Sequence, residues 1–361
     1  MRGAKYHIIA ILILALGCRD RFDGFDFQNT DTKLVIEAIV TDNDQLGYVR
    51  ISYTEPINGN ETRDYVVEDA ASVVVTDDQG TEYTFYNQGE GLYANRTFSP
   101  DYGRQYRMIV QVGANRYESD WQALPSATPP SMDVQYRPDT TQVLNELGNP
   151  VNQHSITLSD EVVKGDDTGL YHWQFNYYYI YDAYGQPDVV VFLPEAVRFC
   201  YVQEHDKPEL VIHEDNFVDG QQGTGYRMDV TSVPFGRKMI YDFSVQVIKY
   251  EVSESLFEYL KLVNQQINRV GGVFDAAPAN IESNFTQVSG NLEVLGFFGV
   301  FNASHQRIFF NQDELPFNKL YLPTDAISCP GDHNVTLSNV CFNCTAVEAP
   351  FNSPTKPAWW R

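Results

Sequence analysis

Basic side chains are scarce in this sequence. The 25 Lys and Arg residues stand against 48 Asp and Glu residues, which gives a formal net charge of −23. A surface this acidic repels the phosphates of nucleic acids and of anionic lipids, so we expect neither as a partner. Any attachment to a membrane should therefore come from a lipid anchor.

Catalytic signatures are also lacking. None of the 7 histidines stands in a recognisable Ser–His–Asp setting, and the GxSxG, HExxH, P-loop and GxGxxG motifs are absent. These absences disfavour the common serine hydrolases, zinc proteases and nucleotide-binding enzymes. The abundant carboxylates leave room for a hydrolase with an unrecognised acidic site, but no pair stands out among them. The sequence predicts a protein that is not an enzyme and uses no cofactor.

Long hydrophobic runs are missing after the first residues, because no later segment approaches the roughly 18 consecutive apolar residues of a membrane-spanning helix. Residues 1–17 have the pattern of a signal peptide, in which Arg2 and Lys5 precede an apolar run over residues 8–16. A glycine and then Cys18 follow this run, as they do where signal peptidase II cleaves a lipoprotein. We predict that Cys18 is lipidated and begins the mature chain, with an ordinary secretory signal as the alternative.

Only five cysteines are present. Four remain if Cys18 carries the lipid, and four cysteines in an exported protein predict two disulfides with three possible connectivities. The close pair Cys341-Phe-Asn-Cys344 could instead be half of a redox or metal site. Because a second CxxC and a thioredoxin-like context are both absent, disulfides are favoured. The disulfide candidates are Cys200, Cys329, Cys341 and Cys344.

The chain then divides into a short tether and a first β domain. Residues 18–32 are polar and acidic, which is typical of a tether between lipid and folded domain. From residue 33 short segments of alternating apolar and polar residues are separated by turn residues. Seven such segments predict an immunoglobulin-like β-sandwich over residues 33–124, with strands at 34–40, 48–54, 71–77, 81–87, 91–98, 104–112 and 115–121.

A larger β-rich domain with one amphipathic helix should follow. The proline-rich residues 125–131 predict a linker, residues 132–320 the second domain, and residues 321–361 a Cys-containing tail. Further strands are expected at 171–185, 197–204, 209–214, 238–252, 293–303 and 306–311.

The helix is expected over residues 253–272. Ser255 and Glu258 have the spacing of a capping box. An apolar stripe should face the core and a pair of glycines should end the helix; the stripe consists of Leu256, Leu260, Val263 and Ile267. The whole chain is thus predicted to be mainly β.

One strand segment, residues 171–181, is unusually aromatic. Every odd position carries an aromatic ring, whereas the even positions are mixed. We predict that one face of this strand lies in the core and that the other contributes to a binding surface. The terminal tryptophans could pack back on the domain, or insert against a partner or a bilayer interface. The speculative ligand or partner surface comprises Tyr171, Trp173, Tyr177, Tyr179, Trp359 and Trp360.

The densest group of possible metal ligands is EHDKPELVIHED at residues 204–215. On a hairpin, His205 and His213 could face each other across two strands and bind a divalent metal. A solvated, charged hairpin explains the same residues, and we favour it. No metal site is therefore predicted.

In its segment order the chain resembles a family of uncharacterised Bacteroidetes outer-membrane lipoproteins, a domain-of-unknown-function family encoded beside TonB-dependent receptors. The resemblance implies a place at the outer membrane next to a nutrient-importing barrel, and it brings no catalytic residues. It rests on TKLVIEAIVTDN, GLYANRTFSPDYGRQYRMIVQVGANRYESDW, RFCYVQE, SLFEYLKLVNQQINRVGGVFDAAPANIESNF followed by VLGFFGVF, and CFNCTAVEAPFNSPTKPAWW.

Together with the lipoprotein signal, the resemblance implies an outer-membrane lipoprotein, which we expect to face the cell exterior. Its expected role is to dock on a TonB-dependent receptor or another outer-membrane barrel complex and to assist substrate capture or uptake. A free-standing glycan- or ligand-binding lipoprotein is the first alternative. A hydrolase with an unrecognised acidic site is the second.

Overall fold

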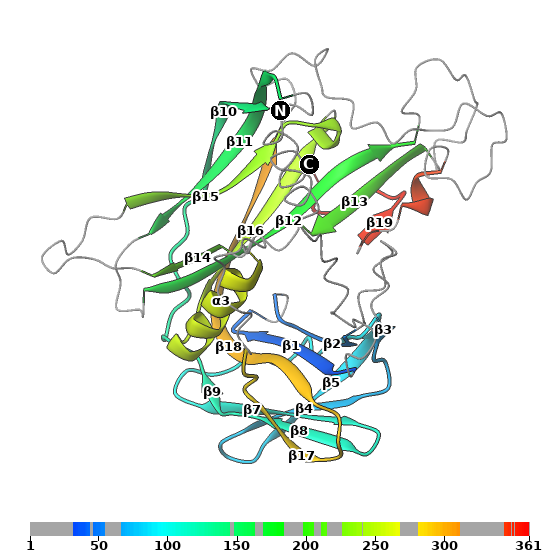
Figure 1. The fold of residues 1–361 in the computed structure, drawn as a ribbon, viewed down its shortest axis with the longest axis vertical. Helices are drawn as coiled ribbons and strands as arrows, with labels where there is room; N and C mark the ends of the chain where they lie inside the picture. The colour runs from blue at the N-terminus through cyan, green and yellow to red at the C-terminus, as the bar shows by residue number, and fades with distance from the viewer. Residues whose placement is uncertain are drawn as a thin grey trace, which may run out of the picture.

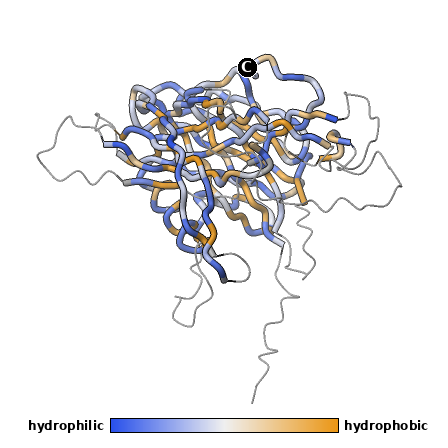
Figure 2. The backbone as a smooth tube through the Cα atoms, turned by 90° about the horizontal axis from the view of Figure 1, so that it is seen from above, coloured by the Kyte–Doolittle hydropathy of each residue, from blue (hydrophilic) through white to orange (hydrophobic). Residues whose placement is uncertain are grey.

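The computed structural model of the protein describes residues 32–43, 46–54, 66–144, 148–162, 169–183, 198–205, 211–214, 226–239, 241–267, 281–310, 343–347, 349 and 351–360. Within these ranges the protein is mainly β, as predicted. Most strands belong to one sixteen-stranded sheet, and the others form a three-stranded sheet (Figure 1). Hydrophilic and hydrophobic stretches alternate along much of the chain (Figure 2), as expected of sheets with a buried face.

The N-terminal half consists of short strands that enclose one core. They are β1 (Leu34–Thr41), β2 (Tyr48–Tyr53), β3 (Val66–Val67), β4 (Ser72–Asp77), β5 (Glu82–Gly89), β6 (Leu92–Ala94), β7 (Gln105–Val112), β8 (Asn115–Ser119) and β9 (Gln122–Ala123). β5 turns a corner, because its first residues pair with β4 and its last residues with β6. Alternate residues of β1, β2, β4 and β7 point inward and form the hydrophobic core that these strands enclose. Each of the seven expected segments contains a strand, and β3 and β9 are additional short strands. The immunoglobulin-like connection of the strands stays a prediction.

One long strand, β18 (Val294–Phe310), runs through both halves of the molecule (Figure 1). Its first part pairs in parallel with β1, and its second part pairs antiparallel with β16 (Phe243–Glu251). We expected two strands with a break after residue 303. The polar residues Ser304 and His305 do not break the strand, because their backbones continue the ladder opposite β16.

Residues near the start of β18 also complete the N-terminal half. β17 (Phe285–Ser289) pairs with β8, so this half takes strands from beyond the predicted range of residues 33–124. Gly296 has a φ of +103°, and a Cβ atom there would lie 2.0 Å from the carbonyl oxygen of Ile36. Glycine is therefore what allows β1 and β18 to approach this closely.

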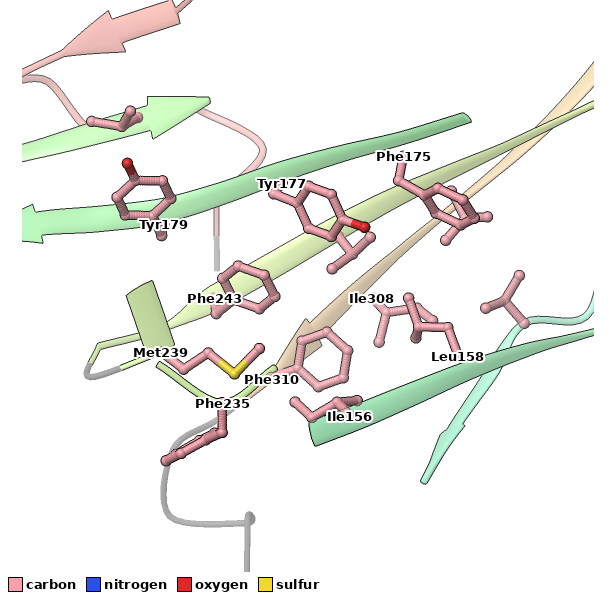
Figure 3. Packing of buried hydrophobic residues seen from close by; sticks show 14 of the residues in the cluster. Ile156, Leu158, Phe175, Tyr177, Tyr179, Phe235, Met239, Phe243, Ile308 and Phe310 are labelled. Carbon is pink, nitrogen blue, oxygen red and sulfur yellow. The ribbon is translucent and has the colours of Figure 1, made fainter. Parts of the chain in front are cut away.

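The C-terminal half packs the three-stranded sheet against the sheet that contains β16 and β18. Its remaining elements are β10 (Gln135–Leu144), β11 (Pro150–Val162), β12 (Leu170–Asp182), β13 (Phe199–His205), β14 (Val211–Glu214), β15 (Tyr226–Pro234), η2 (Arg237–Met239), η5 (Cys344–Ala346) and β19 (Phe351–Ser353). β10, β11 and β15 form the three-stranded sheet. Figure 3 shows Ile156 and Leu158 of β11 facing Ile308 and Phe310 of β18 across the core.

The aromatic side chains at the odd positions of β12 lie inside this core. Tyr171 and Trp173 are 1% and 0% exposed, and Tyr177 and Tyr179 are 6% and 9% exposed. All four belong to the core cluster between the two sheets. The expectation that these four contribute to a ligand surface is therefore wrong, because the three-stranded sheet covers the face from which they project. The other face of β12 is partly accessible at His172 and Gln174, whereas Asn176 and Tyr178 are buried, with 7% and 8% exposed.

Residues 125–131, the predicted linker, are fixed at the junction of the two halves. Ser126 donates a hydrogen bond from Oγ to Oε2 of Glu251 over 2.5 Å. The Nδ2 atom of Asn302 donates to the Ser126 carbonyl over 2.8 Å. Because Glu251 and Asn302 are buried, these bonds are shielded from water and hold the segment against β16 and β18.

The predicted amphipathic helix is α3 (Glu254–Ile267). Its N-terminal cap differs from the expected capping box with Ser255. The Oγ atom of Ser253 instead accepts a hydrogen bond from the Leu256 N–H over 3.4 Å. β16 ends at Glu251 and α3 begins at Glu254. Ser253 is therefore the N-cap residue at which the chain changes from strand to helix.

The first turn of α3 anchors the helix on the outer face of the sheet. Leu256 and Phe257 pack in one cluster with Tyr250 and Phe301, whereas Ile267 at the far end is 48% exposed. The expected apolar stripe is thus buried only at its beginning. Among the described residues no helix is long and apolar enough to cross a membrane.

Candidate functional site

The outer face of the C-terminal sheet carries the mixed side chains that alternate with the buried aromatic ones. Asn176 of β12 lies opposite Gln246 of β16, and Gln246 lies opposite Arg307 of β18. Cross-strand neighbours project to the same side of a sheet, so these side chains form one row. The neighbouring cross-strand rows on the same side of the sheet add further side chains. We call this surface the mixed face, and its members are Gln174, Asn176, Tyr178, Gln246, His305 and Arg307.

The end of the chain docks on one side of the mixed face. β19 pairs with β13 at the edge of the sheet. Trp360 is buried against Tyr201 and Phe309, with ring centroids 5.1 and 6.2 Å away. Trp359 stays 41% exposed and contacts Tyr178 edge-on at 4.8 Å. Of the two alternatives considered for the tryptophan pair, the chain end packs back on its own domain.

A disulfide holds this C-terminal segment to the sheet. Cys200 of β13 and Cys344 of η5 are bonded, and both are fully buried. The Nδ2 atom of Asn352 donates to the carbonyl oxygens of Cys344 and Val347 over 2.9 and 2.8 Å. One of the disulfides allowed by the sequence is thus identified. The other two disulfide candidates, Cys329 and Cys341, and the predicted lipidation site, Cys18, lie outside the described residues.

Arg307 lies at the centre of the aromatic contacts. Its guanidinium carbon lies 3.9 Å from the ring centroid of Trp359 and 4.4 Å from that of Tyr178. Its Nη2 atom donates to Oε1 of Gln246 over 3.2 Å, and the same oxygen accepts bonds from the Tyr178 hydroxyl and Asn176 Nδ2 over 3.3 and 3.5 Å. One amide oxygen therefore serves three donors.

The chemistry that this arrangement offers is that of a binding surface. An exposed indole ring provides a stacking platform, the side-chain amides donate and accept hydrogen bonds, and the guanidinium adds a positive charge. These groups come from three neighbouring strands and the chain end, which together fix their positions.

Sequence reasoning found only part of this surface. It identified Trp359 and Trp360, but it missed Tyr178, Gln246 and Arg307. The useful signal was the strict alternation along residues 171–181, which separates a wholly aromatic face from a mixed one. The amides and the arginine of neighbouring strands carry no such signal, because only strand register places them beside Asn176.

The two histidines considered as metal ligands do not face each other. His205 in β13 lies opposite Asn176, and His213 in β14 lies opposite Tyr171, on the same edge of β12. Five positions along a strand correspond to about 17 Å. The hairpin pairing that a shared metal would need is therefore absent. The ring of His213 contacts the Tyr226 hydroxyl, and no three His, Cys, Asp or Glu side chains of the described ranges gather as metal ligands would.

His172, at the border between the mixed face and α3, is a titratable group in a water-poor position. Its ring stacks on Tyr250 at 5.8 Å, and its Nδ1 atom lies 3.0 Å from the Val211 carbonyl oxygen. Burial lowers the pKa of His172 from 6.5 to about 4, although the bond to the Val211 carbonyl opposes this shift. The folded protein therefore holds this ring neutral at mildly acidic pH.

We expect this histidine to make folding sensitive to acid. Between pH 6.5 and pH 4 the unfolded chain binds a proton at His172 that the folded chain does not bind, so stability falls as the pH falls through this window. The loss should reach about 2 kcal/mol at pH 5 and about 3 kcal/mol below pH 4. Urea unfolding from pH 7.5 to pH 4 measures it.

The His172→Phe variant, which keeps a ring to stack on Tyr250, should lose most of this dependence. A His305→Gln variant removes an exposed histidine and serves as the control that retains it. Identical pH profiles for the wild type and the His172→Phe variant would refute the assignment.

Comparison with protein families finds a match over most of the chain. No curated protein matches the chain. A family whose description reads "Domain of unknown function (DUF4249)" matches residues 23–307. This range ends at Arg307 of the mixed face and leaves the C-terminal segment with Trp359 beyond it. Because the match covers well over half of the sequence, the chain belongs to this family of unknown function.

Proposed function

We propose that this protein is a lipid-anchored outer-membrane protein that docks on a TonB-dependent receptor, or on another outer-membrane barrel, and assists the capture of its substrate. The observation that carries the proposal is the mixed face, where exposed Trp359 lies over Arg307 and Tyr178. We further propose that this face is turned towards the barrel. Tryptophan, tyrosine and arginine are the residues that contribute most binding energy at protein surfaces.

The anchor supports this place in the cell. Residues 1–17 have signal-peptide features, and Cys18 is the proposed site of lipid attachment. Residues 18–32 can span at most about 50 Å when fully extended, so β1, which begins at Leu34, would stay within that distance of the bilayer. Multiple acyl chains on one cysteine would hold the protein firmly, in spite of its acidic surface.

The rigidity of the scaffold supports a binding role. The strands under the mixed face are clamped by α3 on one side and by the disulfide-bonded chain end on the other. β18 continues from this face into the N-terminal half, and the bonds of Ser126 fix the junction between the halves. A backbone held in this way loses little conformational entropy when the surface binds a partner.

Co-purification tests the proposal. The tagged protein is extracted from its own membranes with a gentle detergent, and the partners are identified by mass spectrometry. We expect a stoichiometric outer-membrane barrel with the wild type. A Cys18→Ala variant, which cannot receive the lipid, should lose both the membrane fraction and the barrel.

Protein recovered alone from the membrane fraction would contradict docking. It would favour the free-standing ligand-binding lipoprotein, for which the same mixed face is the binding surface. Protease treatment of intact cells decides the orientation, because full protection would place the protein on the periplasmic leaflet.

A further inference from the structure

Arg307 forms no ion pair with any carboxylate of the described residues, although many arginines of this chain do. Six arginines of the described ranges form ion pairs with Asp or Glu within 4.0 Å, namely Arg104, Arg107, Arg116, Arg137, Arg198 and Arg227. The sequence has 48 acidic residues, yet none of those that the structure describes forms an ion pair with Arg307. Its charge faces two aromatic rings and a single amide oxygen instead.

One edge of this guanidinium is left without an acceptor. The Nη1 atom is buried and makes no hydrogen bond within the described part of the chain. Its neighbour Nη2 shares the Gln246 oxygen with two other donors. A buried charged donor without an acceptor is unfavourable, and a bound acceptor would remove that cost.

We propose that Arg307 receives the carboxylate of a bound acidic sugar, whose ring stacks on Trp359. This inference rests on the proposed function, since it names the chemistry of what the mixed face captures. A carboxylate is the planar acceptor that a guanidinium binds with two parallel hydrogen bonds. The bound carboxylate would give Nη1 the acceptor that it lacks. It would also accept a hydrogen bond from Nη2, so that fewer donors would share Oε1 of Gln246.

The surroundings favour a sugar as the carrier of this carboxylate. Gln174, Gln246 and His305 are accessible on the mixed face, and amide side chains both donate and accept hydrogen bonds, as sugar hydroxyls do. The Trp359 ring is 41% exposed and offers the flat surface on which a sugar ring stacks. Much of the rest of the acidic surface would repel acidic ligands, so a positive charge is needed wherever one is captured.

Access requires the Trp359 side chain to move. Because Nη1 is buried, a carboxylate reaches it only when the indole turns away from its place over the guanidinium. That movement changes the environment of one of the 4 tryptophans. Binding should therefore be visible in the intrinsic fluorescence.

The test is a titration of the purified full-length lipoprotein in mild detergent, followed by tryptophan fluorescence and calorimetry. The probes are galacturonate and glucuronate, with galactose and glucose as neutral counterparts. We expect saturable binding of an acidic sugar and none of its neutral counterpart. The Arg307→Gln variant should bind at least about tenfold more weakly, because a charge-assisted bidentate contact is lost.

Matched variants keep the result interpretable. Arg137→Gln removes an exposed arginine that is already paired with Asp229, and it should bind like the wild type. Arg307→Lys, which keeps the charge, should fold and bind more weakly than the wild type, so it covers the case in which Arg307→Gln does not fold. A Trp359→Phe variant should bind but lose most of the fluorescence change.

The inference is overturned if neither acidic sugar binds, if acidic and neutral sugars bind alike, or if Arg307→Gln binds like the wild type. Binding of an Asp- or Glu-containing peptide in the absence of sugar binding would also overturn it. Loss of sugar binding with intact barrel co-purification would contradict this inference alone. Loss of the barrel with intact sugar binding would contradict only the docking role.

Discussion

Removing the Cys200–Cys344 disulfide should lower the free energy of unfolding by about 3–5 kcal/mol. The bond joins residues 144 positions apart, and a cross-link that closes so long a loop restricts the unfolded chain strongly. Both cysteines are 0% exposed within the C-terminal core. The Cys200→Ala/Cys344→Ala double variant removes the bond without leaving a reactive thiol, and denaturant unfolding under oxidising conditions measures the change.

The loss should begin at the chain end. Without the disulfide, the C-terminal segment is held mainly by the short β13–β19 pairing and by the packing of Trp360. Tryptophan fluorescence should therefore change before the far-ultraviolet circular dichroism as denaturant increases. Coincident transitions at the wild-type midpoint would show that this bond does not hold the segment in place.

Breaking the buried ion pair of Lys249 should cost a similar amount, about 3–5 kcal/mol. The Nζ atom of Lys249 lies 3.1 Å from Oδ2 of Asp160, with both side chains almost fully buried. It also donates to the carbonyl oxygens of Ser131 and Glu161 over 2.9 and 3.2 Å. A Lys249→Met variant leaves the Asp160 carboxylate buried without its counter-charge, which is the main source of the loss.

A double-mutant cycle separates the charge effect from the loss of packing. Asp160 also accepts bonds from the Trp173 indole and from the backbone N–H of Asp133, and an Asp160→Asn change keeps one of the two acceptor oxygens. The Lys249→Met/Asp160→Asn variant should be more stable than the sum of the two single changes predicts. Lys261→Met, at an exposed helical pair with Glu258, is the control and should stay within about 0.5 kcal/mol of the wild type. Strict additivity would contradict a coupled buried pair.

The strands with regular alternation could be predicted from the sequence because their pattern is local. Each predicted segment of the N-terminal half contains a strand, for example residues 104–112 with β7. β10, β11 and β15 were not predicted. Much of β10 and β15 is exposed and polar, so these segments show little apolar periodicity. Pairing between distant segments, such as β1 with β18, depends on tertiary packing that composition does not reveal.

The site was only partly predictable for the same reason. The aromatic signal in a sequence is the same for a residue in a core and for one beneath a surface ring. Tyr171 lies in the core between the sheets, whereas Tyr178 is 8% exposed and packs against Trp359 on the mixed face. The proline-rich residues 125–131 looked like a free linker. Their attachment depends on Glu251 and Asn302, more than a hundred residues away along the chain.

Site-specific photo-crosslinking in intact cells is the most direct test of whether the mixed face contacts the outer-membrane barrel. A photoreactive amino acid is placed at His305, which is exposed on the mixed face, or at Val288 of β17, which is 54% exposed in the N-terminal half. We predict a covalent adduct with an outer-membrane barrel from position 305 and none from position 288. Adducts from position 288 alone would contradict the proposal that the mixed face contacts the barrel. The absence of adducts from both positions, although the barrel co-purifies, would also contradict it.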